Sequence, residues 1–431
     1  MSKFLYRFIL VLARPFVRLR LRRRAAKEPE YGERVEERFG KVPQDIPTGV
    51  VWFHTVSAGE SIAAAPLVRE LKVAFPDLPF LVTTMTPTGS AQVQERLGDI
   101  VAHCYAPYDF NSAVKNFYER VQPKVLILME TELWPNWIKL ARAYDVPVMV
   151  INARLSEKSA RGYSRLSGLV REMLQNIQLI ACQSRAHRDR FIGLGAHAPK
   201  VVVTGSVKFD VALPDDFQDE VSRVRFAFNP EGRPVWIAAS THPGEDELVI
   251  AAHKAILEKT PDVKLILVPR HPVRVEDVGG LLAAAGLSFT LQSDLPNIAS
   301  VENVLLGDTM GTLQYLYGVA DAAFVGGSLV DIGGHNPIEP ALCDIPVATG
   351  PHQHNFADIM ESLSHAGGLQ TITGAEDLAQ VIGEWLGSDE LRMTAGAAAS
   401  AVVAENRGAQ EQVRRLVHTC IAETFTENST A

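Results

Sequence analysis

The chain is poor in cysteine: only Cys104, Cys182, Cys343 and Cys420 occur among 431 residues, and no two of them form a C-x-x-C pair. This scatter excludes a disulfide scaffold and a thiolate zinc site. It fits a protein that works in a reducing compartment, so we expect the globular part to face the cytosol.

Motifs that identify several large enzyme classes are also absent. The sequence has no P-loop G-x-x-x-x-G-K-[ST], no H-E-x-x-H and no G-x-S-x-G, which argues against an NTPase, a zincin protease and an α/β-hydrolase. A match to G-x-G-x-x-A at 193–198 precedes a strand-like run instead of following one, the wrong context for a dinucleotide. No D-x-D triplet occurs, and His352 and His354 lack companion ligands at a recognisable spacing. We therefore predict no metal and no cofactor.

A long uncharged apolar run is missing as well. Residues 4–21 are rich in Phe, Leu, Ile and Val, but Arg7 and Arg14 interrupt them, whereas a membrane-spanning helix needs roughly 20 nearly uncharged residues. Eight basic and no acidic residues precede residue 25, so the remainder is more acidic than the net charge of -8. An acidic body repels nucleic acid, while the basic, apolar arm predicts attachment to an anionic membrane surface, as an interfacial helix or a short tilted anchor. No small-x-small cleavage site follows the arm, which disfavours a signal peptide.

Short apolar runs bounded by turn residues recur in two sets, with helix-length segments between them. Such runs are typical of parallel strands that are buried on both faces. We therefore predict an α/β fold of two doubly wound Rossmann-like domains, whose functional residues follow the strands. The runs are 50–56, 80–85, 125–130, 146–152, 179–184 and 201–205 in the first set, and 235–240, 264–269, 304–309, 322–327 and 345–350 in the second.

The two sets define the expected domain boundaries. A polar, acidic and proline-containing stretch at 210–234 separates them and predicts an interdomain linker. We expect a membrane-anchoring arm at 1–30, an N-terminal domain at 31–209, a C-terminal domain at 235–405, and a C-terminal helix and tail at 406–431.

Charged residues follow three strand-like runs in the first half. Glu60 lies near the start of the helix after the first run, Glu130 ends the run at 125–130, and Lys208 follows the last run. Glu60 is a candidate base, but a first-turn glutamate favoured by the helix dipole is an equally good interpretation. Glu130 could order a sugar or a cation, or cap a helix, and Lys208 could meet an anion or lie solvated at the surface.

The second half contains groups suited to an anionic ligand. Arg270 follows the run at 264–269 and would give a strand end a fixed positive charge that suits phosphate or carboxylate. The segments 307–312 and 325–328 contain glycine turns and small residues at expected helix starts. Their backbone amides could hold phosphate oxygens.

The segment G-G-H-N-P-I-E-P-A at 333–341 combines two glycines with polar residues and prolines. Glu339 could accept hydrogen bonds from ribose hydroxyls. Asn336 and Pro337 also fit the N-cap and the first residue of a helix, and both interpretations can hold together.

Many of these segments, in their order, resemble the Kdo (3-deoxy-D-manno-octulosonic acid) transferase family. The resemblance implies the glycosyltransferase B fold with a central cleft, CMP-Kdo as donor and a lipid A precursor (lipid IVA) as acceptor, in lipopolysaccharide core biosynthesis by an inverting, metal-independent reaction. The segments are HTVSAGE (54–60), TTMTPTG (83–89), YDF (108–110), ETELWPN (130–136), NARLS (152–156), KFD (208–210), STHPGEDE (240–247), VPRHP (268–272), GDTMG (307–311), GGSLVDIGGHNPIEPA (326–341) and GPH (350–352).

The resemblance also implies roles for individual residues. Glu60 looks like the general base that deprotonates the acceptor hydroxyl, and Glu130 and Lys208 match positions linked to transition-state stabilisation. Thr312 stands where Glu is expected, so we expect its contact with the donor to run through its backbone. The positions that match the CMP-contacting segments are Pro269, Arg270, Met310, Gly311, Thr312, Asn336, Pro337, Ile338 and Glu339.

Two alternatives remain open at this point. One is another transferase of the same fold that uses a UDP-sugar, and the other is a non-catalytic, membrane-bound protein that binds a nucleotide sugar. For the leading interpretation we expect an enzyme anchored by its N-terminus to the cytoplasmic side of the inner membrane. The oligomeric state and the number of Kdo residues transferred are not legible in the sequence.

Overall fold

A computed structural model describes residues 3–295 and 302–427. In the arm, the side chains of Lys3, Phe4, Leu5, Arg7 and Phe8 are outside the described part of the structure. Residues 1–2 of the arm and 428–431 of the tail are outside it as well. By its internal contacts the chain divides into two compact units: unit 1 comprises Met1–Asp210 and Arg407–Ala431, and unit 2 comprises Val211–Asn406.

Unit 1 is built on a seven-stranded parallel sheet with the order β3-β2-β1-β4-β5-β6-β7. Successive strand side chains point to opposite faces, and both faces are buried, which explains why the strands read as unbroken apolar runs. The strands are β1 (Val51–His54), β2 (Phe80–Thr84), β3 (Ala102–Tyr105), β4 (Val125–Met129), β5 (Val148–Ala153), β6 (Leu179–Cys182) and β7 (Val201–Val203).

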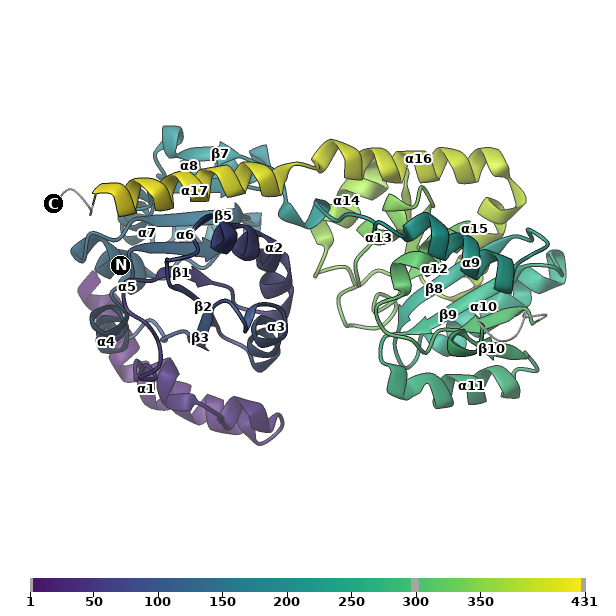
Figure 1. Ribbon diagram of the computed structural model, residues 1–431, viewed down its shortest axis with the longest axis horizontal. Helices are drawn as coiled ribbons and strands as arrows, with labels where there is room; N and C mark the ends of the chain where they lie inside the picture. Colours follow the sequence, from purple (N-terminus) through teal and green to yellow (C-terminus); the bar gives the residue numbers. More distant parts are fainter. Residues whose placement is uncertain (1–2, 296–301, 428–431) are drawn as a thin grey trace. The chain divides into compact units, whose positions relative to one another are not determined.

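Helices cover both faces of this sheet. The C-terminal helix α17 (Ala409–Glu427) contacts α2, β4 and β5 of unit 1, where Val413, Val417 and Ile421 are buried (Figure 1). The others are α1 (Lys3–Ala25), α2 (Ala58–Ala74), α3 (Pro87–Leu97), α4 (Asn111–Val121), α5 (Pro135–Ala143), α6 (Glu157–Ser164), α7 (Ser167–Gln175) and α8 (Arg185–Gly193), with the 3-10 turns η1 (Pro29–Gly32), η2 (Val35–Phe39), η3 (Ala198–Lys200) and η4 (Val207–Phe209).

Unit 2 repeats the architecture with the strand order β10-β11-β9-β8-β12-β13-β14, again all parallel. The prediction of two doubly wound sheets is therefore confirmed. The strands are β8 (Val235–Thr241), β9 (Lys264–Pro269), β10 (Phe289–Leu291), β11 (Val304–Leu306), β12 (Ala322–Val325), β13 (Val347–Thr349) and β14 (Leu369–Thr371). The helices are α9 (Phe217–Phe228), α10 (Asp246–Lys259), α11 (Val275–Ala284), α12 (Leu313–Val319), α13 (Ile338–Leu342), α14 (Ala357–His365), α15 (Ala375–Gly387) and α16 (Asp389–Asn406), with η5 (Pro272–Arg274) and η6 (Gln292–Asp294).

Three local expectations need correction. The stretch 210–234 is not a polar linker throughout, because α9 buries Phe217, Val221, Val224 and Phe228 in the core of unit 2. No helix follows directly from the glycine turn at 325–328; the next one, α13, begins at Ile338. Its N-cap is Pro337 and not Asn336, although the Asn336 Oδ1 still accepts a hydrogen bond of 3.1 Å from the backbone N–H of Ile338.

Helix α1 has one face on unit 1 and one in solvent. On the inner face the Tyr6 hydroxyl donates to Asp109 (2.7 Å) and Leu21 is only 6% exposed. The outer face carries Ile9, Val11, Leu12, Phe16 and Leu19, which are 46–71% exposed. In the described part of the chain, no helix has both the length and the apolar character needed to cross a membrane.

The two sheets share a functional property of doubly wound folds. In unit 1 the chain order reverses between β1 and β4, and in unit 2 it reverses between β8 and β12. Ligands of such folds bind beyond the carboxyl ends of the strands at this switch point. Residues that directly follow β1, β4, β8 and β12 are therefore the first candidates for function.

Candidate active site

Glu60 lies at the switch point of unit 1, in the first turn of α2, just after β1. Its Oε2 accepts a hydrogen bond of 2.8 Å from the backbone N–H of Val56. Burial, followed by the negative charge of Glu130, raises the pKa of the Glu60 carboxyl to about 8. The local hydrogen bond and Lys208 oppose this rise but do not cancel it. A carboxyl pKa raised by burial and by a neighbouring negative charge is common at functional sites.

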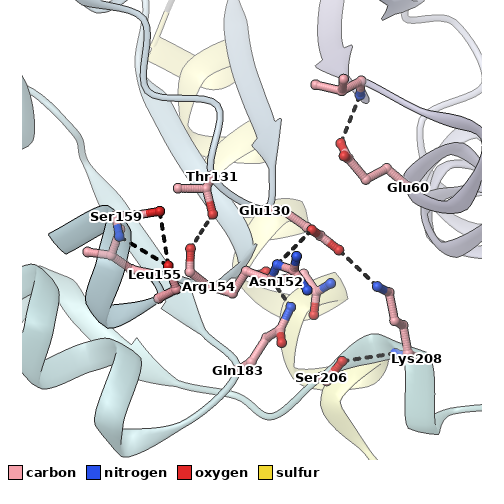
Figure 2. Close-up of polar contacts among 12 residues, drawn as sticks. Glu60, Glu130, Thr131, Asn152, Arg154, Leu155, Ser159, Gln183, Ser206 and Lys208 are labelled. Atoms are coloured by element: carbon pink, nitrogen blue, oxygen red, sulfur yellow. Dashed lines mark hydrogen bonds and ion pairs between the residues drawn. The ribbon is translucent and has the colours of Figure 1, made fainter. Parts of the chain in front are cut away.

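Glu130 follows β4, on the other side of the switch point, and has a left-handed backbone with φ 58°. This conformation is uncommon for a residue with a side chain and often marks functional positions. Its carboxylate lies between two cations, with Lys208 Nζ at 3.1 Å from Oε1 and Arg154 Nε at 3.2 Å from Oε2 (Figure 2). The expected anion partner of Lys208 is therefore found within the chain itself.

The turn that carries Lys208 is held by Asn152, a fully buried residue near the end of β5 with φ 49°. The Asn152 Oδ1 accepts a hydrogen bond of 3.2 Å from the backbone N–H of Val207, and Ser206 caps the same turn by accepting from the Lys208 N–H (3.4 Å). Figure 2 shows Asn152 and Ser206 beside the Glu130–Lys208 ion pair. Lys208 is thus fixed from two sides.

The segment after Glu130 is anchored in the core. Trp137 is buried at 1% exposure against Trp52 and His54, as expected for a large aromatic residue, while the half-buried Trp134 donates its indole N–H to Glu132 (2.7 Å). Burial raises the pKa of the Glu132 carboxyl, and the nearby Glu130 charge adds to this rise. Glu132 thus supports the loop and interacts electrostatically with Glu130.

In unit 2, several of the predicted donor contacts lie together at the carboxyl edge of the sheet. Arg270 directly follows β9, and its positive charge acts on Glu339 in the first turn of α13. Asn336 donates a hydrogen bond of 3.1 Å to the Glu339 carboxylate. Burial raises the pKa of Glu339, and Asn336 and Arg270 oppose that rise. Pro269, Pro337 and Ile338 are buried and shape the same edge.

Met310, Gly311 and Thr312 follow β11, which is separated from β8 by β9. Met310 is 67% exposed and Gly311 has φ 81°, a left-handed turn that glycine adopts without strain. The Thr312 hydroxyl donates to the Thr309 carbonyl (3.0 Å) and accepts from Gln292 (2.9 Å). A contact between Thr312 and a ligand through the backbone is compatible with this geometry.

The glycine turn at 325–328 does not offer free amides to a ligand. Glu245 is fully buried, and its carboxylate accepts backbone hydrogen bonds from Gly327 (2.7 Å), Ser328 (2.9 Å), Leu329 (2.9 Å) and His242 (3.0 Å). The expectation that this turn holds phosphate oxygens is therefore wrong, because the protein supplies its own anion. Glu245 ties the end of β8 to the loop after β12.

Metal-ligand geometry is absent from residues 3–295 and 302–427: no three His, Cys, Asp or Glu side chains lie close enough to hold an ion. His352 lies in a loop, and its Nδ1 is 3.3 Å from Asp331.

Comparison with known proteins gives the family. The model of the 3-deoxy-D-manno-octulosonic-acid transferase (kdotransferase) family matches residues 33–211. The 3-deoxy-D-manno-octulosonic acid transferase of Haemophilus influenzae is 40% identical over 425 residues, covering 97% of this chain and 98% of that protein. The chain belongs to the Kdo transferase family.

Two further similarities support this assignment. The Bordetella pertussis Kdo transferase is 38% identical over 77% of this chain and 78% of its own length. A solved glycosyltransferase from Rickettsia africae aligns over 88% of this chain and 99% of its own, with a TM-score of 0.52 and 14% identity, which supports the fold alone. The protein is thus a Kdo transferase, a glycosyltransferase of the glycosyltransferase B fold.

Some residues of this Kdo transferase site escaped the sequence analysis. Arg154 and Asn152 lie in the NARLS segment, and His242, Glu245 and His335 lie in the STHPGEDE and GGSLVDIGGHNPIEPA segments, but none of them was given a role. Their position in the sequence was the available signal: Asn152 lies near the end of a strand, and the others lie just after a strand or in the glycine-rich loop that follows one. Their contacts depend on strand order, which spacing along the chain does not reveal.

Proposed function

We propose that this Kdo transferase uses CMP-Kdo as donor and a lipid A precursor, lipid IVA, as acceptor, in an inverting and metal-independent transfer with Glu60 as general base. The observation that carries the proposal is the raised pKa of Glu60 beside the Glu130–Lys208 ion pair at the switch point of unit 1. The donor and acceptor come from the resemblance of the whole chain to its family.

The role of Glu60 follows from its protonation chemistry. An acceptor hydroxyl is a poor nucleophile until its proton is removed in the transition state. A base whose pKa is close to the working pH can be unprotonated in part of the population and still bind the incoming proton strongly. Glu60, with a pKa of about 8, meets this requirement, while an ordinary solvent-exposed glutamate would be a much weaker base.

Glu130, Lys208 and Arg154 act by electrostatics in this proposal. The transition state carries developing negative charge where the bond to CMP breaks, and fixed cations in a partly buried site stabilise such charge. Glu130 holds both cations within 3.2 Å of its oxygens and adds the charge that helps to raise the pKa of Glu60. One carboxylate therefore positions the cations and tunes the base.

Unit 2 is proposed to bind the CMP-Kdo donor. Arg270 supplies a fixed positive charge for the phosphate, and Glu339 accepts hydrogen bonds from the ribose hydroxyls. Asn336 orients Glu339 through their hydrogen bond. The remaining donor contacts are Pro269, Met310, Gly311, Thr312, Pro337 and Ile338.

We also propose that α1 anchors the enzyme to the anionic, cytoplasmic surface of the inner membrane. Its solvent-facing side chains are apolar, and Arg20, Arg22 and Arg23 lie near its C-terminal end. This combination is typical of helices that lie in the membrane interface. Such a position would bring the enzyme to an acceptor that is itself embedded in lipid.

The proposal is tested with fresh CMP-Kdo, tetraacylated lipid A precursor and the full-length protein, with product masses read by mass spectrometry. Wild type is expected to add Kdo units, and Glu60→Gln, which keeps the shape but cannot accept the proton, is expected to be slower by ~100-fold or more. CMP should inhibit the reaction and UMP should not. A folded wild type that forms no product would contradict the proposed donor and acceptor. A Glu60→Gln variant with an unchanged rate would contradict the proposed base.

A further inference from the structure

The switch point of unit 2 contains two histidines from segments far apart in the sequence. His242 directly follows β8, and His335 lies in the loop after β12, the neighbouring strand across the switch point. Their Nε2 atoms are 2.8 Å apart, and the rings are stacked with centroids at 5.1 Å and an interplanar angle of 5°. Both rings are half-buried, so the pair borders solvent where a ligand of this fold binds.

The backbone holds His335 in this place. Its N–H donates to the Gly326 carbonyl (3.1 Å), and the N–H of Gly334 donates to the Gly327 carbonyl (2.7 Å). Gly327 has φ 67°, and a Cβ at this residue would lie 2.9 Å from the His335 ring. Glycine is required at 327 because the imidazole occupies the space beside the turn.

Charged and titratable groups surround the pair, and among them Arg274 forms an ion pair with the buried Asp246. Arg270, His271 and Arg274 face it from the segment after β9, and Glu245 faces it from the start of α10. Burial, and then the neighbouring His242, Arg270 and His271, lowers the pKa of His335 to about 4, and burial also lowers the pKa of His242. Both rings are therefore neutral at pH 7, and in the hydrogen bond between them the Nε2–H of one ring donates to the Nε2 of the other.

The glycine turn leaves the imidazoles as the polar groups that face a ligand here. The amides of Gly327, Ser328 and Leu329 are bound to Glu245, whose negative charge also acts on His242 and opposes the lowering of the His242 pKa. The phosphate of CMP-Kdo carries one negative charge, and that of released CMP carries up to two. Either phosphate placed against two imidazoles would favour their charged form, because an opposite charge within hydrogen-bonding distance raises a histidine pKa.

We propose that the His242–His335 pair receives the phosphate of the cytidine nucleotide and takes up one proton from solvent as the phosphate enters. The hydrogen bond between the rings then opens, and both Nε2–H groups donate to phosphate oxygens. This inference rests on the proposed CMP-Kdo donor and adds a phosphate-binding group to it. Departure of CMP in the reaction would return the proton to solvent.

The test is isothermal titration calorimetry of the full-length protein at pH 6.5 in buffers of different ionisation enthalpy. CMP is titrated directly, and cytidine is measured by displacement of CMP. Wild type is expected to prefer CMP to cytidine, and His335→Gln and His242→Gln should each reduce this preference by roughly tenfold or more, with little change in cytidine affinity. His365→Gln, at an exposed position on α14, is the matched control and should behave as wild type.

The number of protons taken up separates a phosphate contact from a merely structural role. The CMP phosphate, with a second pKa near 6, loses protons when it binds beside cations, so net uptake with CMP must come from the protein. Wild type should take up more protons than either variant, and this count can be read on wild type alone if a variant does not fold. If wild type releases protons when CMP binds, or if both variants keep the preference for CMP over cytidine, the proposal that the His242–His335 pair binds the phosphate is wrong. A wild type that binds UMP and not CMP overturns the proposed donor together with it.

Discussion

The carboxylate of Glu130 and the ammonium group of Lys208 form an ion pair of 3.1 Å between the end of β4 and the turn after β7. β5 and β6 separate these two strands in the sheet, so the pair spans much of its carboxyl edge. Arg154, which follows β5, binds the other oxygen of Glu130 from an intermediate position. The ion pair therefore links the end of β4 to the turn after β7, although these two strands are not neighbours in the sheet.

The first prediction concerns this ion pair. Glu130→Gln and Lys208→Met should each lower kcat by about 10²–10³-fold, because the first removes the carboxylate that positions the cations and the second removes a cation that stabilises the transition state. The kcat of the double variant should be only slightly lower than that of the slower single variant, because the effects of substituting residues that act as one unit are not additive. Steady-state kinetics of all four proteins measures this coupling.

Lys158→Met, at an exposed position on α6, is the control for loss of a lysine charge and should keep full activity. Losses that multiply in the double variant would show that Glu130 and Lys208 act independently.

The second prediction is a pH dependence set by Glu60. Since the base must be unprotonated and its pKa is about 8, kcat/KM should rise with pH up to about 8 and then level off. Glu130→Gln removes a neighbouring negative charge that raises this pKa, so the rise should move to lower pH in that variant. A pH profile of the initial rates, with protein stability checked at each pH, tests both statements. An identical midpoint in the two proteins would contradict the electrostatic coupling.

The same carboxyl should reduce stability at high pH. The unfolded chain releases the Glu60 proton near the ordinary glutamate pKa of 4.5, while the folded protein retains it up to a pKa of about 8. Between these values the unfolded state binds fewer protons, so its formation is favoured as pH rises. Glu60→Gln should therefore raise the Tm at pH 8 and leave it nearly unchanged at pH 4.5, as differential scanning fluorimetry can measure. Equal Tm differences at the two pH values would argue against a raised pKa.

The sequence predicts the central strands well because both faces of the sheets are buried. Strands such as β4 and β9 have nearly every side chain buried and read as continuous apolar runs. Strands β3, β10 and β14, all at sheet edges, were missed. β10 and β14 are three residues long and partly exposed, while β3 is short and its sequence AHCY is not a continuous apolar run. Helix α9 was missed because its apolar stripe is interleaved with acidic and basic residues.

The site was predictable in part for a related reason. A residue directly after a buried strand, such as Glu130 or Arg270, or in the first turn of the helix that follows one, such as Glu60, can be identified from the sequence. Contacts across strands cannot, because Arg154 reaches Glu130 only once β4 and β5 are neighbours. Glu245 shows the limit most clearly: spacing identifies the glycine turn as an anion site, but only the fold shows that the anion is a side chain.

The third prediction tests how Lys208 is positioned. Asn152→Ala and Asn152→Gly both remove the acceptor for the Val207 N–H, so both should lower kcat. Asn152 has φ 49°, which costs alanine more than glycine, so the alanine variant should be less stable than the glycine variant by about 1 kcal/mol. Urea unfolding and kcat measure the two effects separately.

CMP binding is the internal control for Asn152, because the proposed nucleotide site lies entirely in unit 2. Unchanged affinity for CMP together with reduced kcat would agree with a local effect on Lys208. Full activity in both variants would show that the hydrogen bond to Val207 does not position the lysine.

The last prediction separates the two faces of α1. Phe16 is 71% exposed, so Phe16→Ser should weaken sedimentation with anionic vesicles and leave the Tm unchanged. Leu21 is 6% exposed, so Leu21→Ser should lower the Tm by burying a hydroxyl against the body of unit 1. Binding of wild type should also weaken at high salt, because the arginines of the arm contribute by screened electrostatic attraction. If Phe16→Ser sediments as wild type does, with a folded protein and the same vesicles, the outer face of α1 is not the membrane-binding surface, and the apolar residues there require another partner.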